Sequence, residues 1–139
     1  MGNLRRHSTR TGDSRPFQIG SAEGTKGGIK VVMSKEWLVD TGAEVSVITK
    51  SNAANFDLTP LAATAMATTT GTGLAMHSGL EMVFKVKDSA GANVTKRCSL
   101  DIGVKPSDEG SEILGMDQIA HHSARVEWDP VALDGDIRL

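Results

Sequence analysis

Hydrophobic and polar residues alternate most clearly over residues 80–87. Apolar side chains stand at Leu80, Met82, Phe84 and Val86, and charged side chains fill most of the positions between them. This period of two predicts a β-strand with one buried face. A turn is predicted over residues 88–91, which read Asp-Ser-Ala-Gly, and residues 94–104 are predicted to return as another strand.

Shorter apolar runs predict further strands. Residues 29–33 and 37–39 are apolar and are separated by Ser-Lys-Glu, which favours a hairpin with its turn at residues 34–36. Residues 44–49 alternate as a half-buried strand requires. Residues 61–73 are rich in Ala, Thr and Gly and carry no bulky side chain near residue 70, which is typical of a mobile hairpin tip.

Helical spacing is found in one segment late in the chain. Residues 117–123 follow Met116 and place Ile119 and Ala120 on the same face, so a short helix is expected there. Residues 51–56 could form a single helical turn, and residues 125–128 resume an extended pattern. Many short strands with one late helix predict an all-β, mostly antiparallel domain.

Chain length limits the organisation of any active site. The chain has 139 residues, 39% of them hydrophobic, which is enough for one domain but too short for two lobes with separate cores. A site that needs two lobes must therefore recruit a second chain.

Composition excludes several classes of protein. Cys98 is the only cysteine, so an intramolecular disulfide and a cysteine-based zinc site are both excluded. The sequence contains neither an apolar stretch of the ~20 residues that span a bilayer nor the apolar centre of a secretory signal. We therefore expect a soluble protein in the cytoplasm or another intracellular compartment, with no membrane partner.

Charge is distributed unevenly along the chain. The net charge is −2, but residues 1–28 carry +3 and the remainder −5. The first 28 residues have few apolar side chains, so we expect a flexible basic N-terminal extension, whose last part could add an edge strand. We expect it to be removable from a domain over residues 29–139. The overall charge argues against a dedicated nucleic-acid binder, and RNA binding by the extension is the weakest alternative.

An acidic residue directly follows the most apolar short run of the chain. Asp40 comes after Trp-Leu-Val and is followed by Thr-Gly-Ala. An ionised acid at the end of a buried strand is costly unless donors approach it, and the small neighbours allow that approach. Asp-Thr-Gly alone is also good chemistry for a simple turn. Its context, between two apolar strands and 72 residues before Glu-Ile-Leu-Gly-Met-Asp at residues 112–117, favours a functional site.

With these motifs the sequence resembles the retropepsin-like aspartic proteases, the family of the retroviral and retrotransposon proteases and their single-lobe relatives. The matching segments are residues 37–47, the glycine-bearing hairpin near residues 71–73, and residues 113–117, in family order. The resemblance covers about residues 29–128. It implies a single-lobe acid-protease fold with a flap hairpin and one short C-terminal helix.

The resemblance also assigns roles to individual residues. Asp40 is expected to be the catalytic carboxylate, and Thr41 to bridge the two active-site loops through its hydroxyl. Gly42 is expected to leave its backbone open to the carboxylate and the substrate. Gly115 is expected to support the active-site loop, and the family's chemistry requires no metal and no cofactor. Substrate contacts are expected from Ala43, Thr69, Thr70, Gly71, Thr72, Gly73, Ile113 and Leu114.

Peptide hydrolysis by carboxylates gives an independent reason for self-association. One ionised acid must deprotonate a water while a protonated acid polarises the carbonyl. The sequence has one Asp-Thr-Gly and no Asp-Ser-Gly. We therefore expect a homodimer that pairs Asp40 with its own copy and cleaves a polypeptide. The main alternative is a peptide-binding or dimerisation module of the same fold with little or no proteolytic activity.

Two other motifs have simpler explanations. His121 and His122 are adjacent on the expected helix, where neighbours point about 100° apart, so they do not form a metal site by themselves. The Gly-Thr-Gly of residues 71–73 lacks the Gly-Lys-Ser/Thr of a phosphate-binding loop.

Overall fold

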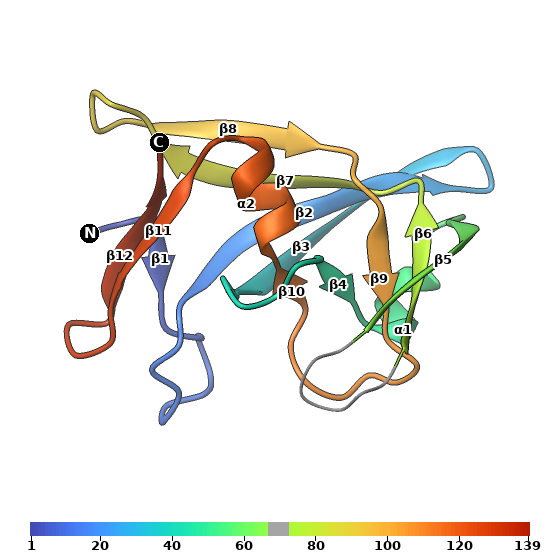
Figure 1. Ribbon diagram of the computed structural model, residues 1–139, viewed down its shortest axis with the longest axis horizontal. Coiled ribbons are helices and arrows are strands. Elements are labelled where there is room, and N and C mark those ends of the chain that lie inside the picture. The colour runs from blue at the N-terminus through green and yellow to red at the C-terminus, as the bar shows by residue number, and fades with distance from the viewer. Residues whose placement is uncertain (67–72) are drawn as a thin grey trace.

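The computed structural model describes residues 1–66 and 73–139. Within them the chain forms twelve strands and two short helices (Figure 1). The strands are β1 (Leu4–Arg5), β2 (Phe17–Lys26), β3 (Ile29–Val39), β4 (Val47–Ile48), β5 (Thr59–Met66), β6 (Gly73–Ser78), β7 (Glu81–Lys87), β8 (Asn93–Cys98), β9 (Ile102–Val104), β10 (Ile113–Leu114), β11 (Arg125–Asp129) and β12 (Asp134–Arg138). The helices are α1 (Lys50–Ala53) and α2 (Met116–His121). The predicted all-β, single-lobe fold with a hairpin and a short late helix is confirmed.

The longest strands, β2 and β3, form one antiparallel hairpin. They pair from Phe17 with Leu38 to Lys26 with Ile29, and Gly27 and Gly28 make the turn with φ of 57° and 78°, a region that favours glycine. The predicted turn at residues 34–36 is therefore wrong, because β3 runs through it without a break. Its polar side chains find partners on either side of the sheet: Lys35 Nζ donates to Asn52 Oδ1 at 3.1 Å, and Glu36 accepts from Ser8.

Two segments of residues 1–28, the strands β1 and β2, belong to the sheet. Leu4 pairs with Gly135, and its side chain is fully buried, as is that of Phe17. The prediction of a flexible extension ending at residue 28 is wrong for these two strands, because Leu4, Phe17 and Ala22 are buried in the core, whereas Ile19 is 45% exposed. The boundary at residue 28 falls inside the β2–β3 turn.

The alternating segment forms β7 as predicted. Leu80, Met82, Phe84 and Val86 are all at most 2% exposed. The expected strand over residues 94–104 is divided. β8 stays beside β7, whereas β9 leaves it to pair parallel with β4 and antiparallel with β6.

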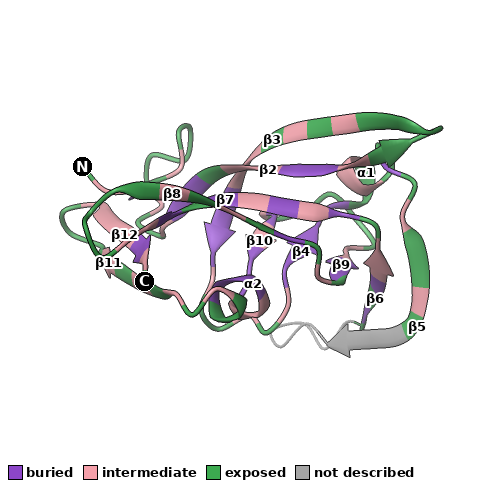
Figure 2. Ribbon diagram, turned by 90° about the horizontal axis from the view of Figure 1, so that it is seen from above, coloured by how far each residue is buried: buried purple, intermediate pink, exposed green. Residues whose placement is uncertain are grey.

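The core lies between the layers of the bent sheet. Figure 2 shows the buried positions gathered on β2, β4, β7 and β10, whereas the far half of β3 is largely exposed. Trp37 of β3, Ile48 of β4 and Ile119 of α2 belong to this core.

Strand β10 brings distant parts of the sequence to one place. It pairs parallel with the end of β3 and antiparallel with β4, through Ile113 opposite Leu38 and Val47. Helix α2 begins directly after it, in the centre of the view in Figure 1. The turn after β3, the start of β4 and the start of α2 therefore meet. Strands β5 and β6 pair as a hairpin elsewhere on the sheet.

Candidate active site

Asp40 lies where β3 leaves the core. Val39 is 3% exposed, and its N–H donates to Pro16 O at 3.0 Å, while the Asp40 N–H donates to Leu114 O at 3.1 Å. The backbone is thus held on both sides of the strand end. Asp40 itself is only half-buried, so a fixed backbone presents its carboxylate at the surface.

The turn after Asp40 folds back on the carboxylate. Gly42 N–H donates to Asp40 Oδ1 at 2.9 Å, and Ala43 N–H donates to Asp40 O at 3.2 Å. A Cβ at residue 42 would lie 3.3 Å from Oδ1, so glycine allows this close approach. The carboxylate makes no ion pair among the described residues.

The segment after β10 packs against this turn. Met116 N–H donates to Ala43 O at 2.8 Å. A Cβ at Gly115 would lie 2.7 Å from Val45 O and 3.0 Å from Ala43 O, both backbone atoms. Only glycine fits at residue 115, which brings the start of α2 into contact with the Asp40 turn.

Ser46 and Asp117 lock the two segments together. The Ser46 hydroxyl donates to Asp117 Oδ1 at 2.7 Å, and the Ser46 N–H donates to Oδ2 at 3.0 Å. Gly115 N–H in turn donates to Ser46 Oγ at 2.9 Å. Ser46 is fully buried. Sequence reasoning missed both residues, although a serine between Val45 and Val47 in a core strand was a usable signal.

An arginine between β1 and β2 is influenced by the charge of Asp40. Arg15 Nη2 donates to Asp13 Oδ2 at 2.7 Å, and Nε donates to Oδ1 at 2.9 Å. This hydrogen bonding raises the pKa of Arg15, and the negative charges of Asp13 and then Asp40 add to the effect. The same contact lowers the pKa of Asp13 to about 2. Arg15 and Asp40 are therefore electrostatic neighbours, a relationship that sequence reasoning also missed.

The structure places the other expected site residues as follows. Thr41 and Gly42 are exposed, and Ala43 and Ile113 are half-buried next to the turn. Leu114 is fully buried in the core, so the expectation that its side chain touches substrate is wrong: its carbonyl holds Asp40 instead. Gly73 is exposed at the start of β6. The expected flap residues Thr69, Thr70, Gly71 and Thr72 lie outside the described residues.

The paired histidines are structural neighbours. Their rings lie 5.1 Å apart, and the His122 ring also meets Phe84 edge-on at 5.4 Å. Burial lowers the pKa of His122. Among residues 1–66 and 73–139, no cluster of three His, Cys, Asp or Glu is arranged to hold a metal ion. No helix in the same residues is long and apolar enough to cross a membrane.

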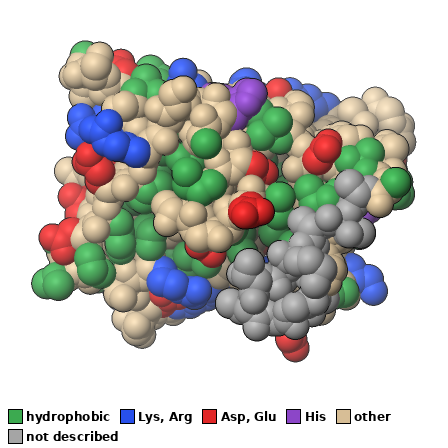
Figure 3. Space-filling model, viewed as in Figure 1, with side chains coloured by type: hydrophobic (Ala, Val, Ile, Leu, Met, Phe, Trp, Pro, Cys, Tyr) green, Lys and Arg blue, Asp and Glu red, His purple; other side chains and the backbone are tan. Residues whose placement is uncertain are grey.

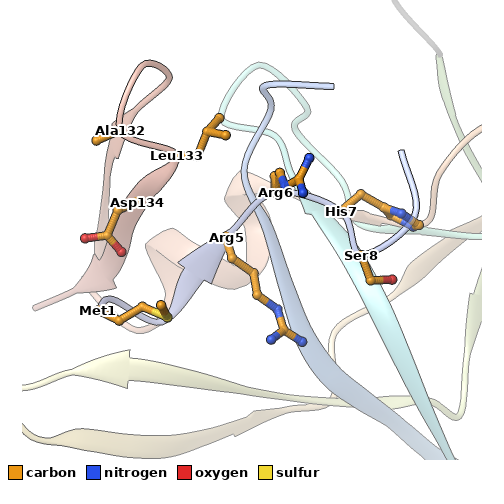
Figure 4. Close-up of a pocket in the computed structure, with 8 residues that line it drawn as sticks. All are labelled: Met1, Arg5, Arg6, His7, Ser8, Ala132, Leu133 and Asp134. Carbon is orange, nitrogen blue, oxygen red and sulfur yellow. The ribbon is translucent and has the colours of Figure 1, made fainter. Parts of the chain in front are cut away.

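A hollow of about 660 Å³ lies away from Asp40, between the start of the chain and the turn after β11. In Figure 4 its basic side chains, Arg5, Arg6 and His7, point in different directions. They do not converge on one ligand position. On the face in Figure 3, Lys and Arg side chains form separate groups with acidic side chains between them.

Comparisons with known proteins give a match to solved structures but not to family models or curated sequences. No protein-family model matches the chain, and no curated protein sequence matches it. Among solved structures, the chain is similar to the EIAV protease complexed with the inhibitor HBY-793. That match has 18% sequence identity and a TM-score of 0.47, and it covers 88% of this chain and 98% of the other.

Proposed function

We propose that this protein is an aspartic endopeptidase of the retropepsin-like type, active as a homodimer. One observation carries the proposal: the Asp40 carboxylate ends a buried strand, is oriented by the Gly42 N–H at 2.9 Å, and is half-exposed without an ion pair in the described chain. The carboxylate is therefore open to water and to a group approaching from the surface, as a general acid or base requires.

The chemistry requires two copies of Asp40. In the dimer, the ionised carboxylate takes a proton from a water whose oxygen attacks the peptide carbonyl carbon. The protonated carboxylate of the other copy donates to the carbonyl oxygen, and collapse of the tetrahedral intermediate breaks the C–N bond as the amine takes a proton. Two acids ~3 Å apart share one proton, so the pair titrates together and suits mildly acidic to neutral pH.

The proposal assigns roles to the remaining residues of the site. The exposed Thr41 hydroxyl would bridge to the loop of the second copy, and the Gly42 backbone would stay open toward the carboxylate. Ala43 and Ile113 would form the floor of the cleft. Gly115 would keep the loop in place through its contact with Val45 O.

The shape of the single chain supports a shared cleft. Thr41 and Gly42 are exposed, and the hollow at the start of the chain does not include Asp40. In a dimer with a two-fold axis, a surface loop can face the same loop of the second copy, and the two loops then form one cleft. The substrate would then be an extended polypeptide held between two copies.

The test compares the wild-type protein with Asp40→Asn on a peptide library from mildly acidic to neutral pH. We expect wild-type cleavage and a loss of roughly 10³-fold or more in kcat/KM in the variant, because the base and acid are both removed. Asp101→Asn, at an exposed aspartate outside the site, is the matched control. Equal cleavage by both proteins would overturn the proposal. Peptide binding without turnover in the wild type would favour the binding module.

A further inference from the structure

Two cations converge on Ser111, just before β10. Arg10 Nη1 donates to Ser111 Oγ at 2.6 Å, and Lys105 Nζ donates to Ser111 O at 2.5 Å. Lys105 Nζ also donates to Glu109 O at 3.1 Å. The two residues are far apart in sequence, so the fold itself brings the like charges together.

Neither cation is neutralised by a direct partner. Among the described residues, Arg10 and Lys105 make no ion pair with Asp or Glu. Burial lowers the pKa of Lys105, Glu112 opposes that shift, and the charge of Arg10 adds to it. Two like charges held on one residue repel, and an anion between them would relieve the repulsion.

A third cation connects this pair to Asp40. The guanidinium carbons of Arg10 and Arg15 lie 5.7 Å and 6.0 Å from the centre of the Phe17 ring. Phe17 is 1% exposed, so it is a fixed platform for both side chains. Arg15 is held by Asp13 and is an electrostatic neighbour of Asp40, whereas Arg10 is exposed and reaches Ser111.

The distance along the backbone from Ser111 to Leu114 indicates how far the two cations lie from Asp40. Glu112 O accepts from Leu38 N–H at 2.8 Å, and Leu114 O accepts from Asp40 N–H at 3.1 Å. Ser111 lies three residues before Leu114, which is about 10 Å in an extended strand. An extended peptide bound at Asp40 would cover that distance with about three residues.

We propose that Arg10 and Lys105 form a carboxylate-binding subsite that selects polypeptide substrates with an acidic side chain about three residues from the cleaved bond. The guanidinium and ammonium groups donate to the carboxylate. This inference rests on the proposed protease function, and it names the substrate class of that site.

The test uses peptide pairs that differ only in Glu or Gln at each position around the cleaved bond. At one position, we expect the wild type to prefer Glu by roughly 10-fold in kcat/KM, as one charge-assisted contact predicts. Arg10→Gln should bring the Glu/Gln ratio close to one, and Arg10→Lys should retain part of it. Arg125→Gln, an exposed arginine on β11, is the control and should keep the wild-type ratio.

Binding measurements separate this subsite from catalysis. The Kd of the Glu and Gln peptides is measured with Asp40→Asn, alone and combined with Arg10→Gln. A Glu preference that Arg10→Gln removes supports the subsite even if the wild type cleaves nothing, in which case only the protease function fails. Equal binding and cleavage of Glu and Gln peptides at every position overturns the subsite. The subsite is also overturned if Arg10→Gln leaves the Glu/Gln ratio unchanged but weakens dimerisation. That result would mean that the cations bind an acidic side chain of the second copy.

Discussion

The hydroxyl of Ser46 donates a hydrogen bond to Asp117 Oδ1 at 2.7 Å, across 71 residues of sequence. This contact joins the strand after the Asp40 turn to the start of α2. Because Ser46 Oγ also accepts a hydrogen bond from the Gly115 N–H, the position of the Asp40 loop depends on a buried polar network.

Removal of this hydroxyl should destabilise the fold. Ser46→Ala leaves the Gly115 N–H without its partner in a buried setting. It also removes one of the two hydrogen bonds that Asp117 Oδ1 accepts, the other coming from the Gln118 N–H. We therefore expect the free energy of unfolding to fall by about 1–3 kcal/mol. Urea denaturation measures it. Ser34→Ala, at an exposed serine of β3, is the control. Equal stability of the two variants would show that the network does not hold the loop.

Gly115→Ala should be poorly tolerated. The added Cβ would stand 2.7 Å from Val45 O, and relief of that contact must move backbone on one side of the Asp40 turn. We expect a loss of about 1–3 kcal/mol in stability, together with reduced cleavage. Gly12→Ala, where a Cβ meets nothing within 4 Å, provides the comparison for thermal unfolding. Matching melting temperatures would refute close packing between Gly115 and the Asp40 turn.

The first residues of the chain should contribute to stability. Leu4 is fully buried, so Leu4→Ala is expected to cost about 2–5 kcal/mol of unfolding free energy. Val131→Ala, at a side chain 91% exposed, should change it by less than about 0.5 kcal/mol. Chemical denaturation of both variants decides the matter. A neutral Leu4→Ala would restore the view of a separate N-terminal extension.

Glu112 should make stability depend on pH. Burial raises its pKa, although it accepts hydrogen bonds from Thr49 N–H and Asn52 Nδ2. A carboxyl whose pKa is higher in the folded state stabilises the fold below its unfolded pKa, and this contribution is lost as pH rises through the folded value.

The comparison is between the wild type and Glu112→Gln, which keeps a neutral acceptor. Relative to the variant, the wild type should be most stable at acidic pH, below the ordinary pKa of a glutamate (~4.3), and should lose that advantage as the pH rises through the raised folded-state pKa. Urea titrations at a fixed protein concentration measure the difference, with Glu109→Gln as an exposed control in the same loop. A wild-type advantage that grows with pH would mean that the pKa of Glu112 is lowered on folding rather than raised.

Local patterns predicted the elements that depend on local sequence. The alternation around Phe84 predicted β7, and the helical spacing around Ile119 predicted α2. The apolar run before Asp40 correctly predicted that a buried strand ends there. In each case the nearest neighbours in sequence decide which face is buried.

Other features depend on pairing across long distances. The polar residues around Lys35 stay within β3 because β2 pairs along its whole length, and Leu4 is buried because β12 lies beside it. The Ser46 network, and the meeting of Arg10 with Lys105, arise from contacts between segments far apart in sequence. No local period encodes these contacts, so the sequence alone did not predict them.

The central claim is that two copies of Asp40 make one active site, and a mixing experiment tests it most directly. Inactive Asp40→Asn is added to an equal amount of wild type under conditions that allow exchange, and peptide cleavage is measured at a fixed wild-type concentration. Random pairing leaves about half of the wild-type chains in wild-type dimers, so cleavage should fall to about half of its value without the variant. Cleavage unaffected by any excess of Asp40→Asn would contradict a shared active site.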